Sequence, residues 1–220
     1  AASVAAAWPS PPAPAGARRP RVLLLDGARR PGAKILVSGG GRCNVTNEVV
    51  TPDDFEGGPR TIIRKVLKGF DERDTRLWFA SLGVELLAEP GGKLFPASNT
   101  ARTVLDALMD AVRAAGTETR FGWRVHDVRP ARDDGFAITG APTAGGAPET
   151  LAARRVILAT GGMALPKSGS DGAGFEWLRA MGHTVVPPVP ALAPLVLGAG
   201  PDPARSEERR VGKECRTRWS

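Results

Sequence analysis

Apolar residues recur at intervals of three and four along several segments of the chain, and this spacing predicts amphipathic helices. The clearest segment is residues 100–115, where Thr100 is expected to cap the first turn and Gly116 to end the helix. Its apolar stripe consists of Val104, Leu105, Leu108, Met109 and Val112. We therefore expect this helix to bury one face against a sheet or another helix.

Residues 59–82 carry a similar pattern and are expected to form two helices. The first stripe consists of Ile62, Ile63, Val66, Leu67 and Phe70. The second helix, at residues 72–82, is predicted to turn Leu77, Trp78 and Phe79 inward. A further helix is expected near residues 174–181.

Short apolar runs bounded by glycine and proline predict the strands. Residues 21–26, RVLLLD, form a strand ending in Asp26, and residues 83–96 read as a hairpin around Pro90-Gly91-Gly92. Single strands are expected at 117–130 and 136–140, with a loop at 141–150. Residues 154–162, RRVILATGG, have the composition of a buried strand that runs into glycines. Buried strands with glycine-rich turns predict an α/β fold with a parallel sheet and a β-meander.

The composition narrows the class of protein. The chain has 220 residues and 42% hydrophobic residues, enough for one globular domain with a core. No apolar run is long enough to cross a bilayer. The net charge of +7 lies in residues 1–34 and 205–220, while residues 35–204 are close to neutral, so no nucleic-acid-binding groove is expected. Two distant cysteines indicate neither disulfides nor a metal site, and they favour a cytoplasmic location.

Two stretches could bind a nucleotide. Asp26 ends an apolar strand, where a carboxylate can accept hydrogen bonds from ribose hydroxyls; an ordinary turn aspartate is the alternative. Residues 38–44, SGGGRCN, offer bare backbone to an anion or a flat ring, with Arg42 as an added positive charge. A flexible surface turn remains the alternative for this glycine triplet.

Other candidates are weaker. Residues 159–162, ATGG, would reach the sheet edge where open α/β sheets bind ligands, and residues 166–174 read as a substrate lid or a linker. Cys43 is more typical of a packing residue than of a redox thiol. His126 and His183 have no partner nearby in sequence, and structural or surface roles are favoured over general-base catalysis.

Three longer segments together resemble a known family. They are residues 21–47, which include KILVSGGGRCNVTN, residues 91–108, GGKLFPASNTARTVLDAL, and residues 155–195, which begin with RVILATGG. In order and spacing they are similar to the BaiN/RdsA-type NAD(P)/FAD-dependent oxidoreductases, which are aminoacetone-oxidase-like flavoproteins. The resemblance runs from about Arg21 to about Leu197.

The resemblance implies an incomplete Rossmann-like, glutathione-reductase-type FAD-binding domain. It implies that Asp26 holds the ribose and that Arg124 and Val125 lie near the adenine. It also places two groups of residues along the FAD, namely Lys34 with Ser38, Gly39, Gly40, Gly41, Arg42, Cys43 and Asn44, and Thr160 with Gly161 and Gly162. The flavin would then pass hydride between NAD(P)H or a small-molecule substrate and an acceptor, while no catalytic acid or base can be named.

The chain departs from the family pattern in three respects. Residues 1–20 are rich in alanine and proline and lack the GxGxxG turn, and Lys34 stands where the family usually has arginine. Residues 205–220 share nothing with the family and are expected to be a non-native or disordered basic tail. We therefore expect an irregular segment at 1–20, a partial FAD-binding domain at 21–198 and a tail at 199–220. An inactive fragment and a nucleotide-binding module without redox activity remain the alternatives.

Overall fold

The computed structural model describes residues 20–132, 134–164 and 169–189. The expectations for residues 1–19, for most of the proline-rich segment after 187 and for the basic tail lie outside these ranges. The chain divides into two compact units. Unit 1 consists of Ala1–Lys34 and Leu108–Pro188, and unit 2 consists of Ile35–Ala107 and Val189–Ser220. Each unit is described by itself.

The parallel sheet of unit 1 is a pair of short strands. Strand β1 (Leu23–Asp26) runs parallel to β5 (Glu118–Phe121), with Asp26 opposite Phe121. Residues Leu23 to Leu25 are apolar, and Leu24 is buried. The predicted strand at the start of the chain and its parallel pairing are therefore confirmed, and Asp26 lies at the carboxyl end of the pair.

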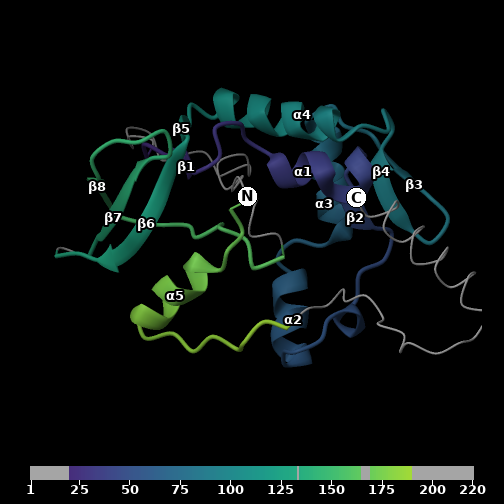
Figure 1. Cartoon of the computed structure of the whole chain (residues 1–220). Helices are drawn as coiled ribbons and strands as arrows, with labels where there is room; N and C mark the ends of the chain where they lie inside the picture. The colour runs from purple at the N-terminus through teal and green to yellow at the C-terminus, as the bar shows by residue number, and fades with distance from the viewer. Residues whose placement is uncertain (1–19, 133, 165–168, 190–220) are drawn as a thin grey trace, which may run out of the picture. The chain divides into compact units, whose positions relative to one another are not determined.

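The other regular elements described in unit 1 include an antiparallel meander and a helix that packs on it (Figure 1). Strands β6 (Trp123–Pro130), β7 (Phe136–Pro142) and β8 (Glu149–Ala153) pair in that order, and α5 (Ala173–Ala180) contacts β6. The core side chains of this unit are Trp123, Val128, Ile138 and Trp177. The indole Nε1 of Trp177 donates to the carbonyl of His126 at 3.3 Å, which ties α5 to β6.

Two sequence-based boundaries in this unit are wrong. Residues 117–130 form two strands instead of one, because Gly122 adopts a left-handed backbone with φ of 67° and redirects the chain between β5 and β6. Residues 141–150 are not simply a loop, since β7 continues to Pro142 and β8 begins at Glu149. Residues 149–153, ETLAA, contain no aromatic residue and only one β-branched residue, Thr150, so their pairing with β7 decides their conformation.

The predicted buried strand at residues 154–162 is also wrong. This segment has no regular secondary structure, and Ile157 is 65% exposed. Its apolar composition suits a strand, but a strand exists only when a neighbouring strand completes its hydrogen bonds. None of the described strands pairs with residues 154–162.

Unit 2 is built on a small antiparallel sheet. Strand β4 (Lys93–Pro96) pairs on one side with β3 (Leu86–Ala88) and on the other with β2 (Thr46–Asn47). The predicted hairpin is therefore confirmed, with the added strand β2. Leu94 and Phe95 are buried at 0% and 5% exposure and lie at the centre of this unit's core.

Three helical segments follow β2 in unit 2 (Figure 1). They are the 3-10 helix η2 (Pro52–Asp54), α2 (Arg60–Leu67) and α3 (Glu72–Ser81). Two helices were predicted here, but their inward faces were only partly right. Phe79 is buried, whereas Leu77, Ile62 and Val66 are 71%, 59% and 68% exposed. The apolar pattern predicted the two helices correctly, but several of their apolar side chains remain exposed.

Helix α4 (Ala101–Ala114) confirms the clearest sequence prediction. The amide of Arg102 donates to the Thr100 hydroxyl, and Gly116 has φ of 69° just past the helix end. Val104, Leu105, Leu108 and Val112 are buried, and Met109 is half-buried. The short α1 (Ala33–Val37) and the 3-10 helix η1 (Ser38–Gly41) precede β2. Among the described residues, no helix has the length and apolarity needed to span a bilayer.

Candidate functional site

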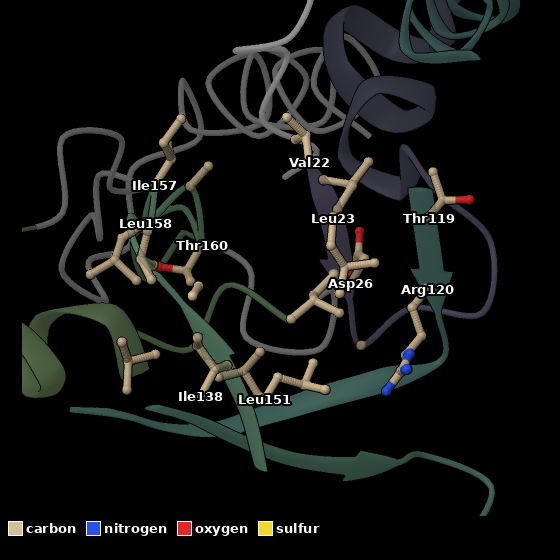
Figure 2. A pocket seen from close by; sticks show the side chains of 18 of the residues that line it. Val22, Leu23, Asp26, Thr119, Arg120, Ile138, Leu151, Ile157, Leu158 and Thr160 are labelled. Atoms are coloured by element: carbon tan, nitrogen blue, oxygen red, sulfur yellow. The ribbon is translucent and has the colours of Figure 1, made fainter. Parts of the chain in front are cut away.

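A cavity of about 1370 Å³ lies within unit 1. Its walls are β1, β5, parts of the meander and the irregular residues 154–160. Figure 2 shows Leu23 and Asp26 on one side of the opening, Ile157 and Leu158 on the opposite side, and Leu151 below. We call this space the unit 1 cavity.

Asp26 stands at the carboxyl end of β1 on the rim of the unit 1 cavity. One carboxylate oxygen, Oδ1, accepts a hydrogen bond from the amide of Ala28 at 2.9 Å. This bond closes a short turn and fixes the side chain after the strand ends. The second oxygen, Oδ2, has no protein donor among the described residues, so it remains available to accept hydrogen bonds from a ligand's hydroxyl groups.

Arg124 approaches the same rim from β6. Its guanidinium pairs with Asp171 and lies 3.4 Å from the carbonyl oxygen of Gly169. Burial acts to raise the pKa of Asp171, but the Ala173 amide and the Arg124 charge outweigh it and hold that pKa below its ordinary value. A Cβ placed on Gly27 would come within 3.1 Å of Arg124 Cδ, so the glycine after Asp26 allows this close approach.

Thr160 reaches the cavity from the irregular segment that follows residue 154. Thr160 packs against Gly174, the last residue of the segment 166–174 that was predicted as a lid or a linker. The contact is close, because a Cβ on Gly174 would lie 2.3 Å from Thr160 Oγ1. The described part of this loop is well packed: Ser170 is 1% exposed, and a Cβ on Gly161 would meet its Oγ at 3.0 Å. Residues 165–168 lie outside the described residues.

The unit 1 cavity therefore collects some of the predicted site residues and not others. Asp26, Arg124, Val125 and Thr160 all line it, although they come from three separate stretches of the chain. Gly161 and Gly162 follow directly but do not line it, nor does Lys34 of α1.

The remaining predicted residues, Ser38–Asn44, belong to unit 2. The glycine triplet is an ordered left-handed turn, with φ of 56° at Gly39 and 67° at Gly40. The amide of Cys43 closes the turn by donating to the Ser38 carbonyl at 3.0 Å. A Cβ on Gly39 would lie 2.8 Å from the Asn44 amide nitrogen and 2.9 Å from the Phe95 ring. The backbone therefore needs glycine because it lies directly against Phe95 of β4.

Arg42 is already engaged within unit 2. Its guanidinium lies 4.1 Å from the centroid of Phe95 and pairs with Glu89, and it approaches Asn99 Oδ1 at 3.4 Å. A cation over an aromatic face and beside a carboxylate is held in a defined place. The same ring thus supports both the glycine turn and the arginine that follows it.

Cys43 has the features of a packing residue. It is 7% exposed with φ of 64°, and burial raises the pKa of its thiol against the opposing effect of the Ser38 hydrogen bond. A raised pKa keeps the thiol neutral, which disfavours nucleophilic chemistry. This geometry agrees with the favoured interpretation of the sequence.

Some rim residues were missed by the sequence interpretation. Gly27 and Asp171 shape the rim, and Ile138 and Leu151 form the cavity wall between strands. The DG pair at Gly27 and the SDG triplet around Asp171 were visible signals of turns. Nothing in the sequence linked them, because their proximity depends on both lying against Arg124 of β6.

Comparisons with known proteins identify the family of this chain. The HI0933-like protein Rossmann domain matches residues 11–202. The 3-dehydro-bile acid delta(4,6)-reductase of Clostridium scindens is 39% identical over 175 residues, covering 80% of this chain and 41% of that protein. The ribosomal RNA dihydrouridine synthase of Escherichia coli is 31% identical over 184 residues, covering 83% of this chain and 44% of that protein.

The chain thus spans less than half the length of each of these relatives. Its family is nevertheless settled, because the matched region contains β1, the glycine turn, the meander and the loop before α5. The resemblance seen in the sequence and the α/β fold with a parallel pair are both confirmed. The chain belongs to the HI0933-like protein Rossmann-domain family.

Proposed function

We propose that this chain supplies part of the FAD-binding fold of a flavin-dependent oxidoreductase. The observation that carries the proposal is Asp26, which ends a parallel strand at a cavity rim with one carboxylate oxygen uncommitted. Open parallel sheets bind dinucleotides at the carboxyl ends of their strands, where such a carboxylate accepts hydrogen bonds from ribose hydroxyls. The name of the Clostridium scindens relative, a reductase, supports the reaction class.

The rim residues fit the adenosine half of FAD. Asp26 would hold the ribose, and Arg124 and Val125 on β6 would flank the adenine. Because the Arg124 guanidinium is fixed by Asp171, it offers a flat, charged surface without a large loss of side-chain freedom. Thr160 would contact the cofactor from the opposite wall. Bound FAD supplies the ring that accepts and returns hydride, so reducing equivalents would pass between NAD(P)H or a small substrate and an acceptor.

The substrate is proposed to be a small molecule. The two relatives are named for different substrates, a bile acid derivative and ribosomal RNA, so the family does not fix it. The near-neutral charge of residues 35–204 favours a small molecule over a nucleic acid, which would need a basic face.

Flavin titration of the purified 220-residue chain tests the proposal. We expect FAD to bind with quenched flavin fluorescence, and Asp26→Asn to weaken binding by about 10- to 150-fold, since a charge-assisted hydrogen bond contributes roughly 1.5–3 kcal/mol. The asparagine oxygen can still accept from the Ala28 amide, so the local turn is kept. Asp106→Asn, at an exposed position on α4, is the matched control and should bind FAD normally. Equal affinity of both variants would refute the role of Asp26.

A nucleotide-binding module without redox activity is the second candidate. It is favoured by the position of Asp26 and Arg124, which both serve the adenosine half, and by the chain's partial coverage of its relatives. Competition separates the two functions. ADP alone binding as tightly as FAD supports the module, whereas a clear preference for FAD over both ADP and FMN supports the flavoprotein.

A further inference from the structure

Helix α2 of unit 2 presents to solvent an apolar row that its sequence pattern predicted to be buried (Figure 1). Ile62 and Val66 lie one helical turn apart, so they share a face, and they are 59% and 68% exposed. Ile63 and Leu67 form a second row one turn apart, and both are half-buried. The helix is therefore attached to its unit along the second row, and within the described residues nothing buries the first.

Lysine side chains accompany the exposed apolar row. Lys65 follows Ile62 by three residues and Lys68 follows Lys65 by three, so the three side chains are neighbours on the helix surface. Both lysines are exposed, and neither forms an ion pair within the part of the chain that the structure describes. Residues 57–70 contain four Lys/Arg and no Asp/Glu. We call Ile62, Lys65, Val66 and Lys68 the α2 strip.

The stability of the helix explains the cations of α2 but not its exposed apolar row. Lys65 lies in the last turn of α2, where the helix dipole favours positive charge. Arg60, in the first turn, pairs with Asp53. Isoleucine and valine, however, have lower helix propensity than many polar residues, and exposing them to water is unfavourable. The apolar part of the α2 strip therefore requires a reason outside the helix itself.

We propose that the α2 strip docks on the surface of an anionic phospholipid bilayer, with α2 lying in the plane of the interface. Ile62 and Val66 enter the boundary between the headgroups and the acyl chains. The lysine stems extend beside them and bring their ammonium groups to the lipid phosphates. The anionic headgroups supply the negative charge that residues 57–70 lack. With eight residues, α2 is far too short to span a bilayer and suits interfacial binding alone.

The chemistry of the α2 strip favours a bilayer over two other negatively charged partners, an acidic protein and RNA. A protein that binds a basic amphipathic helix encloses its whole apolar face in a groove. The apolar face of α2 is already partly occupied, because Ile63 and Leu67 are half-buried in unit 2. RNA binding combines cations with aromatic rings on which bases stack, and the α2 strip contains no aromatic residue. A flat surface needs only the accessible side of the helix.

Sedimentation of the full 220-residue chain with lipid vesicles, in the absence of flavin, tests this proposal. The probe is phosphatidylcholine containing about one-third phosphatidylglycerol, at about 1 mM lipid, and pure phosphatidylcholine is the comparison. We expect the chain to bind the anionic vesicles, and binding should weaken as salt rises from about 0.1 M to about 1 M. The basic residues in 1–34 and 205–220 also attract anionic lipid, so variants of α2 decide the result.

One matched pair of double variants tests the charged part of the α2 strip. Lys65→Gln with Lys68→Gln should lower the partition coefficient by about 25-fold, at about fivefold for each lysine near an anionic surface. Arg102→Gln with Arg113→Gln removes the same charge from exposed positions on α4. This control should change the partition coefficient by less than about twofold, because those positions lie outside the α2 strip.

A second matched pair tests the apolar part. Ile62→Gln should lower the partition coefficient by about tenfold, whereas Leu87→Gln, at a 52% exposed position on β3, should leave it unchanged. A nitrobenzoxadiazole label on Val66→Cys, in a Cys215→Ser background, should brighten and shift to shorter wavelength with anionic vesicles, since Cys43 is buried and stays unlabelled. The same label at position 87 should not change. Circular dichroism and urea midpoints confirm that every variant is folded.

Each other outcome overturns the proposal. Equal losses from the α2 and α4 double variants mean that total charge or the chain ends bind the lipid. A loss with the lysine variants but none with Ile62→Gln means charge attraction without docking. Equal binding to pure phosphatidylcholine means general apolar adhesion. Lysine-dependent binding of oligouridine or polyglutamate without vesicle binding assigns the strip to RNA or to an acidic protein, and no binding at all leaves it without a partner. The proposal does not rest on flavin binding, so failure of FAD to bind leaves every readout intact.

Discussion

Replacing Gly39 with alanine tests how the glycine turn is held in unit 2. Gly39 has φ of 56°, and a Cβ there would lie 2.8 Å from the Asn44 nitrogen and 2.9 Å from the Phe95 ring. Gly83 is the matched control, because it has φ of 78° in the same unit and no atom within 4 Å of its Cβ position. Both alanines carry the same kind of backbone strain, so the difference between them isolates the crowding at Gly39.

The expected loss of unfolding free energy has two contributions, the backbone strain and the crowding of the added methyl group. A left-handed backbone costs alanine about 1–2 kcal/mol at either position. Forcing a methyl group into a packed site costs about 1–3 kcal/mol more at Gly39, because neither the Asn44 backbone nor the buried Phe95 ring moves freely. Gly39→Ala should therefore lower the free energy of unfolding by about 2–5 kcal/mol, against about 1–2 kcal/mol for Gly83→Ala.

Urea unfolding followed by circular dichroism measures both values at one pH. Phe95→Leu in the Gly39→Ala background should cost less than the sum of the single changes, because the two sites share a contact. Equal destabilisation by Gly39→Ala and Gly83→Ala would refute the inference that the turn depends on close packing against Phe95.

Three further predictions concern ionisation and core packing. The pKa of Asp171 is lowered in the folded state, so its contribution to stability is present above the unfolded pKa of about 4 and is lost as pH falls through the folded value. Asp171→Asn should therefore flatten the acid side of the profile of unfolding free energy against pH. An unchanged profile would contradict the pairing with Arg124. The pKa of the Cys43 thiol is raised in the folded state, so its contribution to stability is present below the unfolded pKa of about 8.5 and is lost as pH rises through the folded value. Iodoacetamide labelling of Cys43 at pH 9, read by peptide mass spectrometry, should be slower in the folded chain than in the urea-unfolded chain. Equal labelling rates would contradict the burial of Cys43. Leu94→Ala should destabilise by about 2–5 kcal/mol in urea unfolding and Leu87→Ala by well under that, since Leu94 is fully buried and Leu87 is 52% exposed; similar losses would mean that Leu94 is not in the core.

Local chemistry accounts for the parts of the structure that the sequence predicted well. The apolar stripe of α4, the Thr100 cap and the Gly116 that follows the helix all act within one helix. The local sequence is therefore enough to predict this helix. The hairpin of β3 and β4 is equally local. Asp26 was placed correctly at a strand end because an apolar run followed by a polar turn determines that position.

The site was predictable residue by residue but not as an arrangement. Asp26 and Thr160 were named from short motifs, Arg124 and Val125 were named from the family resemblance, and all four line one cavity. Asp171 was not named, because its role comes from an ion pair with a residue 47 positions away. Such a pair has no signature in either local sequence.

The amino-acid sequence by itself determined the helices, most of the short strands and the family of this protein, whereas the contact with Phe95 decided that the turn before Cys43 needs glycine. Tertiary structure alone decided whether residues 156–160, whose composition suits a strand, become one. Side-chain pattern sets what a segment can bury, but a strand also needs a neighbour to complete its backbone hydrogen bonds. That neighbour is a property of the folded sheet, so the irregular conformation of residues 156–160 could be seen only in three dimensions.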